Sequence, residues 1–401
     1  MTSQNHRHLQ RALEKIPWAT QTNAKRYQPD WPGMPPFIER AKGCRLWDLD
    51  GREYIDYRCS LGPIILGHQV AAVDDAVRKQ MQKGILFSMA SPLELEAAEA
   101  ILRNTVWPDQ VRFMKTGNDA CVSCVRLSRS LTDRDHIVSA GYHGFHDWFA
   151  TTWPHAGVPS PLRDLVHEVN YNDLDTLAKV FEQYGSQIAC LIIEPYDWGE
   201  DLGKEFVQRS RSLCDHYGSL LIFDEVLTGF RMALGGAPAF YGITPDFSAF
   251  AKALANGYPL SAFVGKKEVM SALDKAILTT TYAGEALSLA ACCATMQIMH
   301  DENVHVHLYA MGRRLRQGFE EICREVNAPA IMYGLEVSQS IRFTVPEPDA
   351  TTLYNRLYAS LFQQGIFANV RWFVSYSHQP SDIDETLDKM RLAMKETLAD
   401  R

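Results

Sequence analysis

The stretch Ser219-Leu-Leu-Ile-Phe-Asp-Glu-Val-Leu-Thr-Gly-Phe-Arg231 begins with an apolar run that ends in an acidic pair. A short apolar run bounded in this way is typical of a buried strand, and it brings Asp224 to the strand end. The second deciding segment is Ala251-Lys-Ala-Leu-Ala-Asn-Gly-Tyr-Pro-Leu260, in which Lys252 stands among small and apolar residues. An amine in such surroundings loses its proton easily and becomes a nucleophile.

Together, Asp224 and Lys252 supply what a pyridoxal 5′-phosphate (PLP) enzyme requires. A lysine forms the Schiff base, and a carboxylate keeps the ring nitrogen protonated so that the ring accepts electrons. The run before Asp224 also looks like the Walker B strand of a nucleotide hydrolase, which requires the motif G-x-x-x-x-G-K-[ST] upstream. The sequence has no such motif, because Gly265-Lys-Lys267 lacks both the first glycine and the hydroxyl residue. The PLP hypothesis is therefore favoured.

The composition indicates a soluble globular protein with more than one domain, since the 401 residues are 46% hydrophobic and 22% charged. A net charge of −8 argues against general binding to nucleic acid or to anionic membranes. No apolar run reaches transmembrane length, and the polar first ten residues lack a signal-peptide core. Nine cysteines, an odd number, are typical of reduced thiols. We expect a cytoplasmic protein without nucleic-acid or membrane partners.

The spacing of apolar residues predicts an alternation of strands and helices after an irregular N-terminal arm over residues 1–40. Residues 43–57 contain two alternating segments on either side of an Asp50-Gly51 turn and predict a hairpin. Residues 73–83 and 93–102 have helical spacing. Further strands are predicted at 111–114, 136–139, 188–193, 220–223 and 262–264, and helices at 120–131, 174–184, 206–217 and 285–300. Such alternation predicts a mainly parallel sheet covered on both faces, with ligands at the carboxyl ends of its strands.

The segment Met114-Lys-Thr-Gly-Asn-Asp-Ala120 predicts a strand end, a tight turn and a helix start. Backbone N–H groups at a helix N-terminus bind phosphate, and Gly117 permits close approach while Thr116 and Asn118 add donors. A simple helix cap is the alternative. Thr279-Thr-Thr-Tyr-Ala-Gly-Glu285 is a second hydroxyl-rich turn with the same two interpretations.

Three further positions suit a planar cofactor. Tyr142 in the loop Gly141-Tyr-His-Gly-Phe-His-Asp-Trp148 can stack on one ring face, and Val226 can pack against the other. Glu194 ends a predicted strand with a carboxylate. His143, His146 and Asp147 could form part of a metal site, as could Cys121 with Cys124, but neither set has a full complement of ligands, and we expect no metal.

These segments occur in the order found in aminotransferase class III, a family of fold-type I PLP enzymes. The chain resembles this family over about residues 16 to 386, and within it is most similar to glutamate-1-semialdehyde 2,1-aminomutase-like proteins. The motifs that carry the resemblance are Thr20-Gln-Thr22, Tyr54-Ile-Asp-Tyr57, Gly62-Pro-Ile-Ile-Leu-Gly-His68, the turn at Gly117, Tyr142-His-Gly144, Tyr171-Asn-Asp173, Glu194-Pro195, Phe223-Asp-Glu-Val226 and the Lys252 segment.

The resemblance implies an α/β fold whose large domain has a mainly parallel seven-stranded sheet flanked by helices, with a small α+β domain built from both termini. It implies an N-terminal arm and part of the small domain at 1–60, the large PLP-binding domain at 61–299 and the C-terminal small domain at 300–401. It also implies a homodimer with shared active sites, in which Thr281 reaches the phosphate of the neighbouring subunit's cofactor.

The resemblance also implies residue roles. Lys252 forms the internal aldimine and shuttles the proton, Asp224 pairs with the ring nitrogen, and Tyr142 stacks on the ring. The remaining cofactor-binding residues are Thr116, Gly117 and Asn118 at the phosphate, and His143, Glu194 and Val226 in the pocket. The implied reaction is a ping-pong transfer of an amino group from a small-molecule amino donor to a keto or aldehyde acceptor.

Departures from the family pattern leave the substrate open. Lys115-Thr-Gly-Asn-Asp-Ala120 replaces N-S-G-T-E-A, and Glu285 stands in a segment that is commonly S-G-N-P in the aminomutase. The aminomutase's N-S-P-V-R arginine has no counterpart in residues 20–26, where Arg26 and the distant Arg371 are candidate replacements. An intramolecular aminomutase of the glutamate-1-semialdehyde type therefore remains the alternative, with a racemase or a catalytically idle PLP-binding protein behind it.

Overall fold

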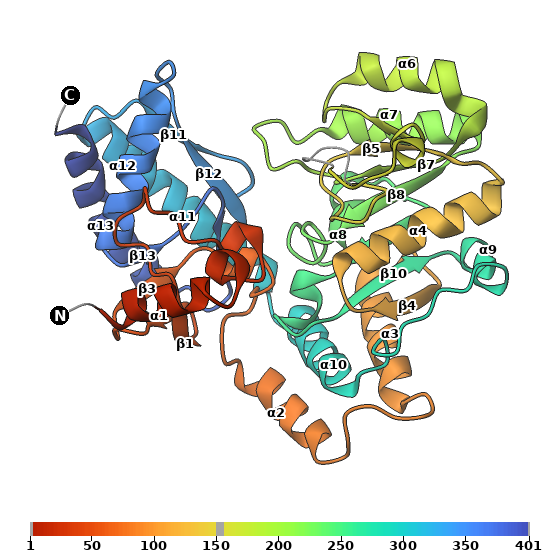
Figure 1. Cartoon of the computed structure of the whole chain (residues 1–401), viewed down its shortest axis with the longest axis horizontal. Coiled ribbons are helices and arrows are strands. Elements are labelled where there is room, and N and C mark those ends of the chain that lie inside the picture. The colour runs from red at the N-terminus through yellow and green to blue at the C-terminus, as the bar shows by residue number, and fades with distance from the viewer. Residues whose placement is uncertain (1–2, 150–155, 400–401) are drawn as a thin grey trace. The chain divides into compact units, whose positions relative to one another are not determined.

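A seven-stranded sheet organises the part of the chain between residues 71 and 305 (Figure 1). Neighbouring strands β9, β8, β7, β5 and β6 pair in parallel, whereas β10 is antiparallel to both β4 and β9. The predicted mainly parallel, seven-stranded sheet is thus confirmed. In spatial order the strands are β4 (Gln110–Met114), β10 (Ser261–Gly265), β9 (Phe247–Phe250), β8 (Leu220–Glu225), β7 (Ile188–Ile193), β5 (His136–Ala140) and β6 (Val166–Glu168).

Helices cover both faces of this sheet because its central strands are apolar throughout, and all six residues of β7 are buried. Helix α4 (Gly117–Thr132) packs against β7, β8, β9 and β10. Helices α6 (Leu174–Tyr184) and α7 (Lys204–Tyr217) pack against each other on the opposite face (Figure 1). The chain crosses the sheet in one direction through α4 and in the other direction through α6 and α7. Because such crossovers are right-handed, the two directions place their helices on opposite faces. Cys121 and Cys124 are fully buried on α4, so core packing explains their spacing.

The computed structural model describes residues 3–149 and 156–399, and it divides into two compact units, Ala71–His305 and Met1–Val70 with Val306–Arg401. In the first unit, α10 (Ala286–Asp301) packs against α2 (Ala71–Met81) and α3 (Pro92–Thr105), and short helices α5 (Ser160–Arg163), α8 (Gly236–Tyr241) and α9 (Lys267–Met270) complete it. None of the helices in the described ranges is long and apolar enough to cross a membrane.

The second unit is an α+β structure to which both ends of the chain contribute, as predicted. Its first sheet has the order β1 (Ile38–Lys42), β2 (Arg45–Asp48), β3 (Glu53–Asp56) and β13 (Ile366–Phe367), so a C-terminal strand completes the N-terminal hairpin. Its second sheet consists of β11 (Ala330–Tyr333), β12 (Ser338–Phe343) and β14 (Trp372–Phe373). Its C-terminal helices are α11 (Val304–Glu325), α12 (Asp349–Gln363) and α13 (Pro380–Leu398).

The predicted irregular arm over residues 1–40 is wrong in part, because α1 (Gln4–Leu13) forms there. The side chain of Ser3 caps this helix by accepting a hydrogen bond from the His6 N–H. The backbone N–H of Gln4 and the side chain of Asn5 also donate to the Asp50 carboxylate, at 2.6 and 3.0 Å. The helix therefore starts on the hairpin turn, a contact that local spacing cannot reveal.

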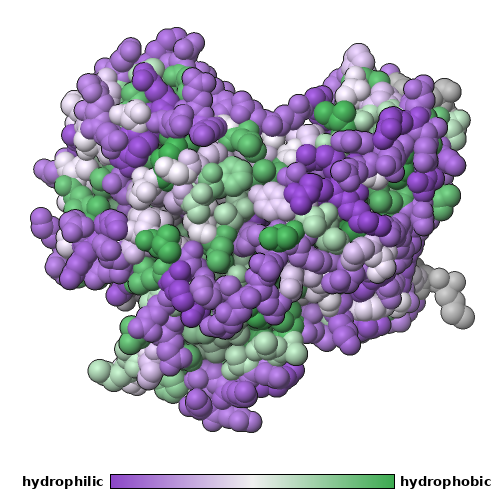
Figure 2. Space-filling model, turned by 180° about the vertical axis from the view of Figure 1, so that it is seen from behind, coloured by the Kyte–Doolittle hydropathy of each residue, from purple (hydrophilic) through white to green (hydrophobic). Residues whose placement is uncertain are grey.

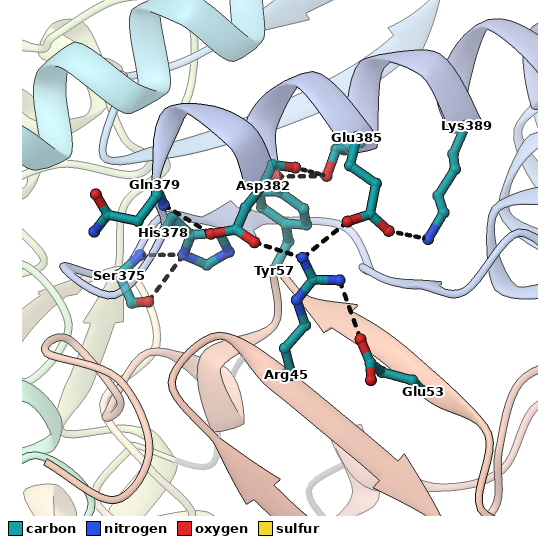
Figure 3. A network of polar contacts seen from close by, with 10 residues as sticks. Arg45, Glu53, Tyr57, Ser375, His378, Gln379, Asp382, Glu385 and Lys389 are labelled. Atoms are coloured by element: carbon teal, nitrogen blue, oxygen red, sulfur yellow. Dashed lines mark hydrogen bonds and ion pairs between the residues drawn. The ribbon is translucent and has the colours of Figure 1, made fainter.

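A network centred on Arg45 ties the hairpin to the last helix (Figure 3). Its guanidinium donates to Glu53 Oε1 on β3 at 3.2 Å, and to Asp382 Oδ1 and Glu385 Oε2 on α13 at 2.5 and 2.8 Å. Lys389 donates to the other Glu385 oxygen at 2.6 Å. The hydrogen bond from Arg45, aided by Lys389, lowers the pKa of Glu385 to about 2. Because this folded-state pKa lies below the ordinary value of 4.5, the stabilisation is present above about pH 4.5 and is lost as the pH falls toward 2.

We expect Arg45→Met to lower the free energy of unfolding at pH 7 by roughly 2 kcal/mol, because hydrogen bonds to charged groups are lost and Asp382 stays partly buried. The difference from the wild type should shrink as the pH falls below about 4.5 and the carboxylates are protonated. Urea unfolding followed by circular dichroism over this pH range measures both effects. Arg314→Met is the matched control, since Arg314 and Asp384 are about half exposed and solvent screens their pair, which should make the loss much smaller. Equal losses in the two variants would contradict the assignment.

Candidate active site

The parallel pairing of β5, β7 and β8 brings three strand ends to one edge of the sheet. Ala140 pairs with Ile193, and Ile193 pairs with Phe223, so the residues that follow these positions are neighbours. The backbone N–H of Tyr142 donates to Glu194 Oε2 at 3.2 Å. Three of the predicted site residues, Tyr142, Glu194 and Asp224, are therefore gathered at the edge where ligands of such sheets bind.

Asp224 is fixed by two hydrogen bonds in a buried position. His143 Nδ1 lies 2.8 Å from Asp224 Oδ2, with side chains 0% and 4% exposed. The Val226 N–H donates to Asp224 Oδ1 at 3.0 Å. Because an ionised carboxylate only accepts, the His143 proton is assigned to Nδ1. Burial and the Asp224 charge hold the pKa of Cys121 well above its ordinary value, so a neutral thiol lies beside this carboxylate.

The turn before α4 leaves hydrogen-bond donors without acceptors. Thr116 and Asp119 cap the helix reciprocally, with Asp119 N–H donating to Thr116 Oγ1 at 3.1 Å and Thr116 N–H to Asp119 Oδ2 at 2.8 Å. The next two N–H groups, those of Gly117 and Asn118, have no acceptor within the helix. The Asn118 Nδ2 is buried and has no partner within the described ranges. This donor set fits a phosphate group.

Two glycines allow this turn to be closely packed. A Cβ on Gly117 would lie 2.6 Å from Val226 Cγ2, so the turn and the residue after β8 are in close contact. A Cβ on Gly144 would lie 1.7 Å from Asn118 Oδ1, and Gly144 has a φ of +107°. The Asn118 Oδ1 also lies 3.4 Å from the His146 N–H that donates to it. The loop of residues 141–148 therefore fixes the Asn118 amide, because Gly144 packs against it and His146 donates to its oxygen.

Lys252 lies just after β9, which is the strand next to β8. Ala249 of β9 pairs with Asp224 of β8. Its φ of 45° lies in the left-handed region, a conformation that costs a non-glycine residue roughly 1–2 kcal/mol and is concentrated at functional sites. Burial raises the pKa of Glu194, and the charge of Asp224 acts in the same direction, while the charges of His143 and Lys252 oppose it. Lys252 thus belongs to the same electrostatic cluster as Asp224 and Glu194.

The structure brings nine of the ten predicted site residues into this cluster and leaves Thr281 outside it. Tyr142 is 51% exposed. Thr281 is exposed on the segment that precedes α10, where it lines a hollow of about 590 Å³ with Ser88 and Arg112. None of the contacts that join the other nine in the described part of the chain includes Thr281.

The sequence analysis missed a pair that connects these two regions. Lys115 Nζ lies 3.1 Å from Glu285 Oε2 and 3.4 Å from Ser288 Oγ. Glu285 also caps α10 by accepting from the N–H groups of Leu287 and Ser288. Burial raises the pKa of Glu285, but hydrogen bonds from the Ser288 hydroxyl, the Leu287 N–H and Lys115 outweigh it and lower the pKa. Lys115 and Glu285 both differ from the family pattern and carry opposite charges, and in the structure they pair. Their opposite charges were the only sequence feature that could have predicted this pair.

Comparison with known proteins agrees with this geometry. Residues 27–394 match the family described as aminotransferase class-III. Glutamate-1-semialdehyde 2,1-aminomutase from Sulfurihydrogenibium azorense is 34% identical, with 90% of this chain and 92% of that protein covered. 3-Aminobutyryl-CoA aminotransferase from Cloacimonas acidaminovorans is 33% identical, with 90% and 89% covered. The structure of the PLP internal aldimine form of the Sphingopyxis sp. MTA144 FumI protein matches with a TM-score of 0.93 at 29% identity, covering 99% of this chain and 97% of that one.

The sheet and these likenesses define a fold-type I PLP enzyme. The chain belongs to aminotransferase class III. This membership confirms the predicted family, fold and PLP-dependent enzyme class.

We expect Gly144→Ala to weaken PLP binding at least tenfold, because the new methyl group must displace the Asn118 amide and its donor. Absorbance titration of the apoprotein with PLP measures the dissociation constant. Gly242→Ala is the control, since Gly242 also has a positive φ, of +71°, but no atom lies within 4 Å of the added carbon. Unchanged PLP affinity in Gly144→Ala would show that Asn118 does not contact the cofactor.

Proposed function

We propose that this class III aminotransferase transfers an amino group between two separate small molecules, from an amino donor to a keto or aldehyde acceptor. The observation that carries PLP-dependent amino-group chemistry is the buried pair between His143 and Asp224, at 2.8 Å, in the same cluster as Lys252. The lack of a counterpart to the aminomutase's N-S-P-V-R segment in residues 20–26 favours transfer between two molecules. When bound, PLP supplies a conjugated ring that accepts the electron pair released at the substrate carbon.

Each residue of the cluster has a distinct proposed task. Asp224 holds a proton at the ring nitrogen, and His143 orients its carboxylate and stabilises its negative charge. The N–H groups of Gly117 and Asn118, with the Asn118 amide, bind the phosphate, and Thr116 fixes the helix start beside it. Tyr142 and Val226 lie against the two ring faces, and Glu194 holds the Tyr142 backbone.

Lys252 would hold the cofactor through Nζ, and as a free amine Nζ would take the proton from the substrate carbon and return it to another carbon atom. The residues on either side of Lys252 suit this role. Ala251 and Ala253 are small and buried, so neither carries a polar side chain that would compete with the lysine amine. Proton transfer by a positioned group of this kind is worth roughly 10²–10⁴-fold in rate.

We expect Lys252→Ala to reduce turnover by at least roughly 10²-fold, whereas Lys266→Ala, at an exposed lysine paired with Asp109, should leave it unchanged. The assay follows the visible absorbance of the PLP-loaded protein while amino donors are added singly. Loss of the visible band with stoichiometric release of a keto product supports transfer. A band that persists with every donor, together with rearrangement of an amino aldehyde or a diamine, would instead favour the intramolecular aminomutase.

A homodimer with shared active sites is also proposed, with the unit Ala71–His305 as the large PLP-binding domain and the other unit as the small domain. Thr281 lies outside the cluster, as a residue that serves the partner's cofactor would. Near it in the same hollow, Leu86, Phe87 and Met89 are 41%, 45% and 83% exposed. Hydrophobic residues also reach the surface in patches on the face that Figure 2 shows. An apolar segment of this kind favours burial against a second subunit.

We expect Met89→Asp to shift the protein from dimer toward monomer and to lower PLP retention, because a charge is placed on the proposed interface. Sedimentation velocity measures the dimer fraction. Leu392→Asp is the control, since Leu392 is 52% exposed but lies on α13 in the other unit. A monomeric wild type, or a dimer that Met89→Asp leaves intact, would contradict this interface.

The cytoplasm is the proposed location. All nine cysteines are free thiols, and eight of them are buried. Such a set suits a reducing compartment.

A further inference from the structure

A cavity with both apolar and charged lining residues lies wholly within the unit formed by Met1–Val70 and Val306–Arg401. Its volume is about 290 Å³, close to the lower end of the range for small-molecule pockets. Apolar side chains such as Phe37 and Phe367 form part of its wall. The polar residues that line it are Thr20, Lys25, Asp56, Arg58, Ser60 and His68.

Arg58 is the unusual member of this set. The residue is 6% exposed, and its guanidinium makes no hydrogen bond or ion pair with any residue in the described ranges. Its buried Nε is an unsatisfied donor. Burial lowers the pKa of Arg58, and the charge of Asp56 only opposes this effect. A buried cation whose donors are unpaired is strongly unfavourable, so its retention calls for an acceptor that enters the cavity.

Asp56 does not serve as that acceptor, because among the described residues its carboxylate makes no hydrogen bond with the Arg58 guanidinium and is engaged elsewhere. Oδ1 accepts from the N–H groups of Arg58 and Cys59 at 2.9 and 3.0 Å. Oδ2 lies 3.1 Å from His68 Nε2. The exposed Lys25 adds a second positive charge to the lining. The cavity therefore offers more donors than acceptors to whatever occupies it.

The backbone beside Arg58 is held in an uncommon conformation. Cys59, Ser60 and Leu61 have consecutive positive φ values of 44°, 54° and 73°. The steric cost of such residues persists where the surrounding structure enforces it, as at ligand sites. Ser60 and Leu61 form part of the cavity wall, so this strained turn shapes the space next to the guanidinium.

We propose that this cavity binds the carboxylate or phosphate group of a small metabolite, with Arg58 as the residue that pairs with it. A guanidinium presents its donors in a fork that matches either anion at two points. The cavity volume suits a ligand of the size of a short dicarboxylate. Arg26, considered from the sequence as a carboxylate partner, is exposed instead, with its guanidinium 5.8 Å from the Trp18 ring centroid.

The test compares thermal unfolding of the PLP-loaded wild type, Arg58→Met and Arg26→Met with succinate or inorganic phosphate at constant ionic strength. We expect at least one probe to raise the melting temperature of the wild type and of Arg26→Met. Calorimetric titration should show at least a tenfold weaker affinity for that probe in Arg58→Met. A response to succinate alone identifies a carboxylate site, and a response to phosphate alone identifies a phosphate site.

The variant without any probe provides the second measurement. Arg58→Met should then melt at the same temperature as the wild type or higher, because an unpaired buried charge has been replaced by an apolar side chain of similar length. The proposal is overturned if neither probe affects the wild type, if Arg58→Met responds as the wild type does, or if Arg58→Met without probe melts well below it. Because melting and calorimetry do not require turnover, the result is independent of the proposed transfer reaction.

Discussion

The parallel register of β5, β7 and β8 is the constraint on which the active site depends. It pairs Ala140 with Ile193 and Ile193 with Phe223, so the residues after each strand meet at one edge. A slip of one residue in any strand would turn its last side chain to the other face of the sheet. The uninterrupted burial of β7 makes such a slip costly, and the core thereby fixes the position of Asp224 relative to Glu194.

Local patterns were enough to predict most strands and helices, because each is encoded in a continuous run. The prediction of α6 matches its observed ends, and β8 was recognised from its apolar run. Strand β9 escaped because Ser248 interrupts its four residues, and that hydroxyl is buried with its hydrogen bond to Glu225 Oε1 at 3.3 Å. Helix α1 escaped because it is polar and starts on Asp50, 46 positions away from Gln4.

For the site, sequence analysis identified residues but not their partners. Asp224 and Lys252 stand in distinctive segments, whereas the pair between His143 and Asp224 joins positions 81 residues apart. The pair between Lys115 and Glu285 spans 170 residues. Whether a charged side chain is paired depends on the folded chain. For this reason the sequence did not single out Arg58, which directly follows the predicted hairpin.

The buried polar groups of the chain fall into two kinds, those already hydrogen-bonded within the protein and those with an unsatisfied donor. Asp224 is surrounded by donors from His143 and Val226, so its charge is stabilised before any ligand arrives. Within the described ranges, Asn118 Nδ2 and Arg58 Nε have no acceptor, which is why both places are proposed to bind an anion. With a net charge of −8, the molecule as a whole repels anions at long range. Recognition at both places must therefore come from short-range hydrogen bonds in buried surroundings, where salt screens little.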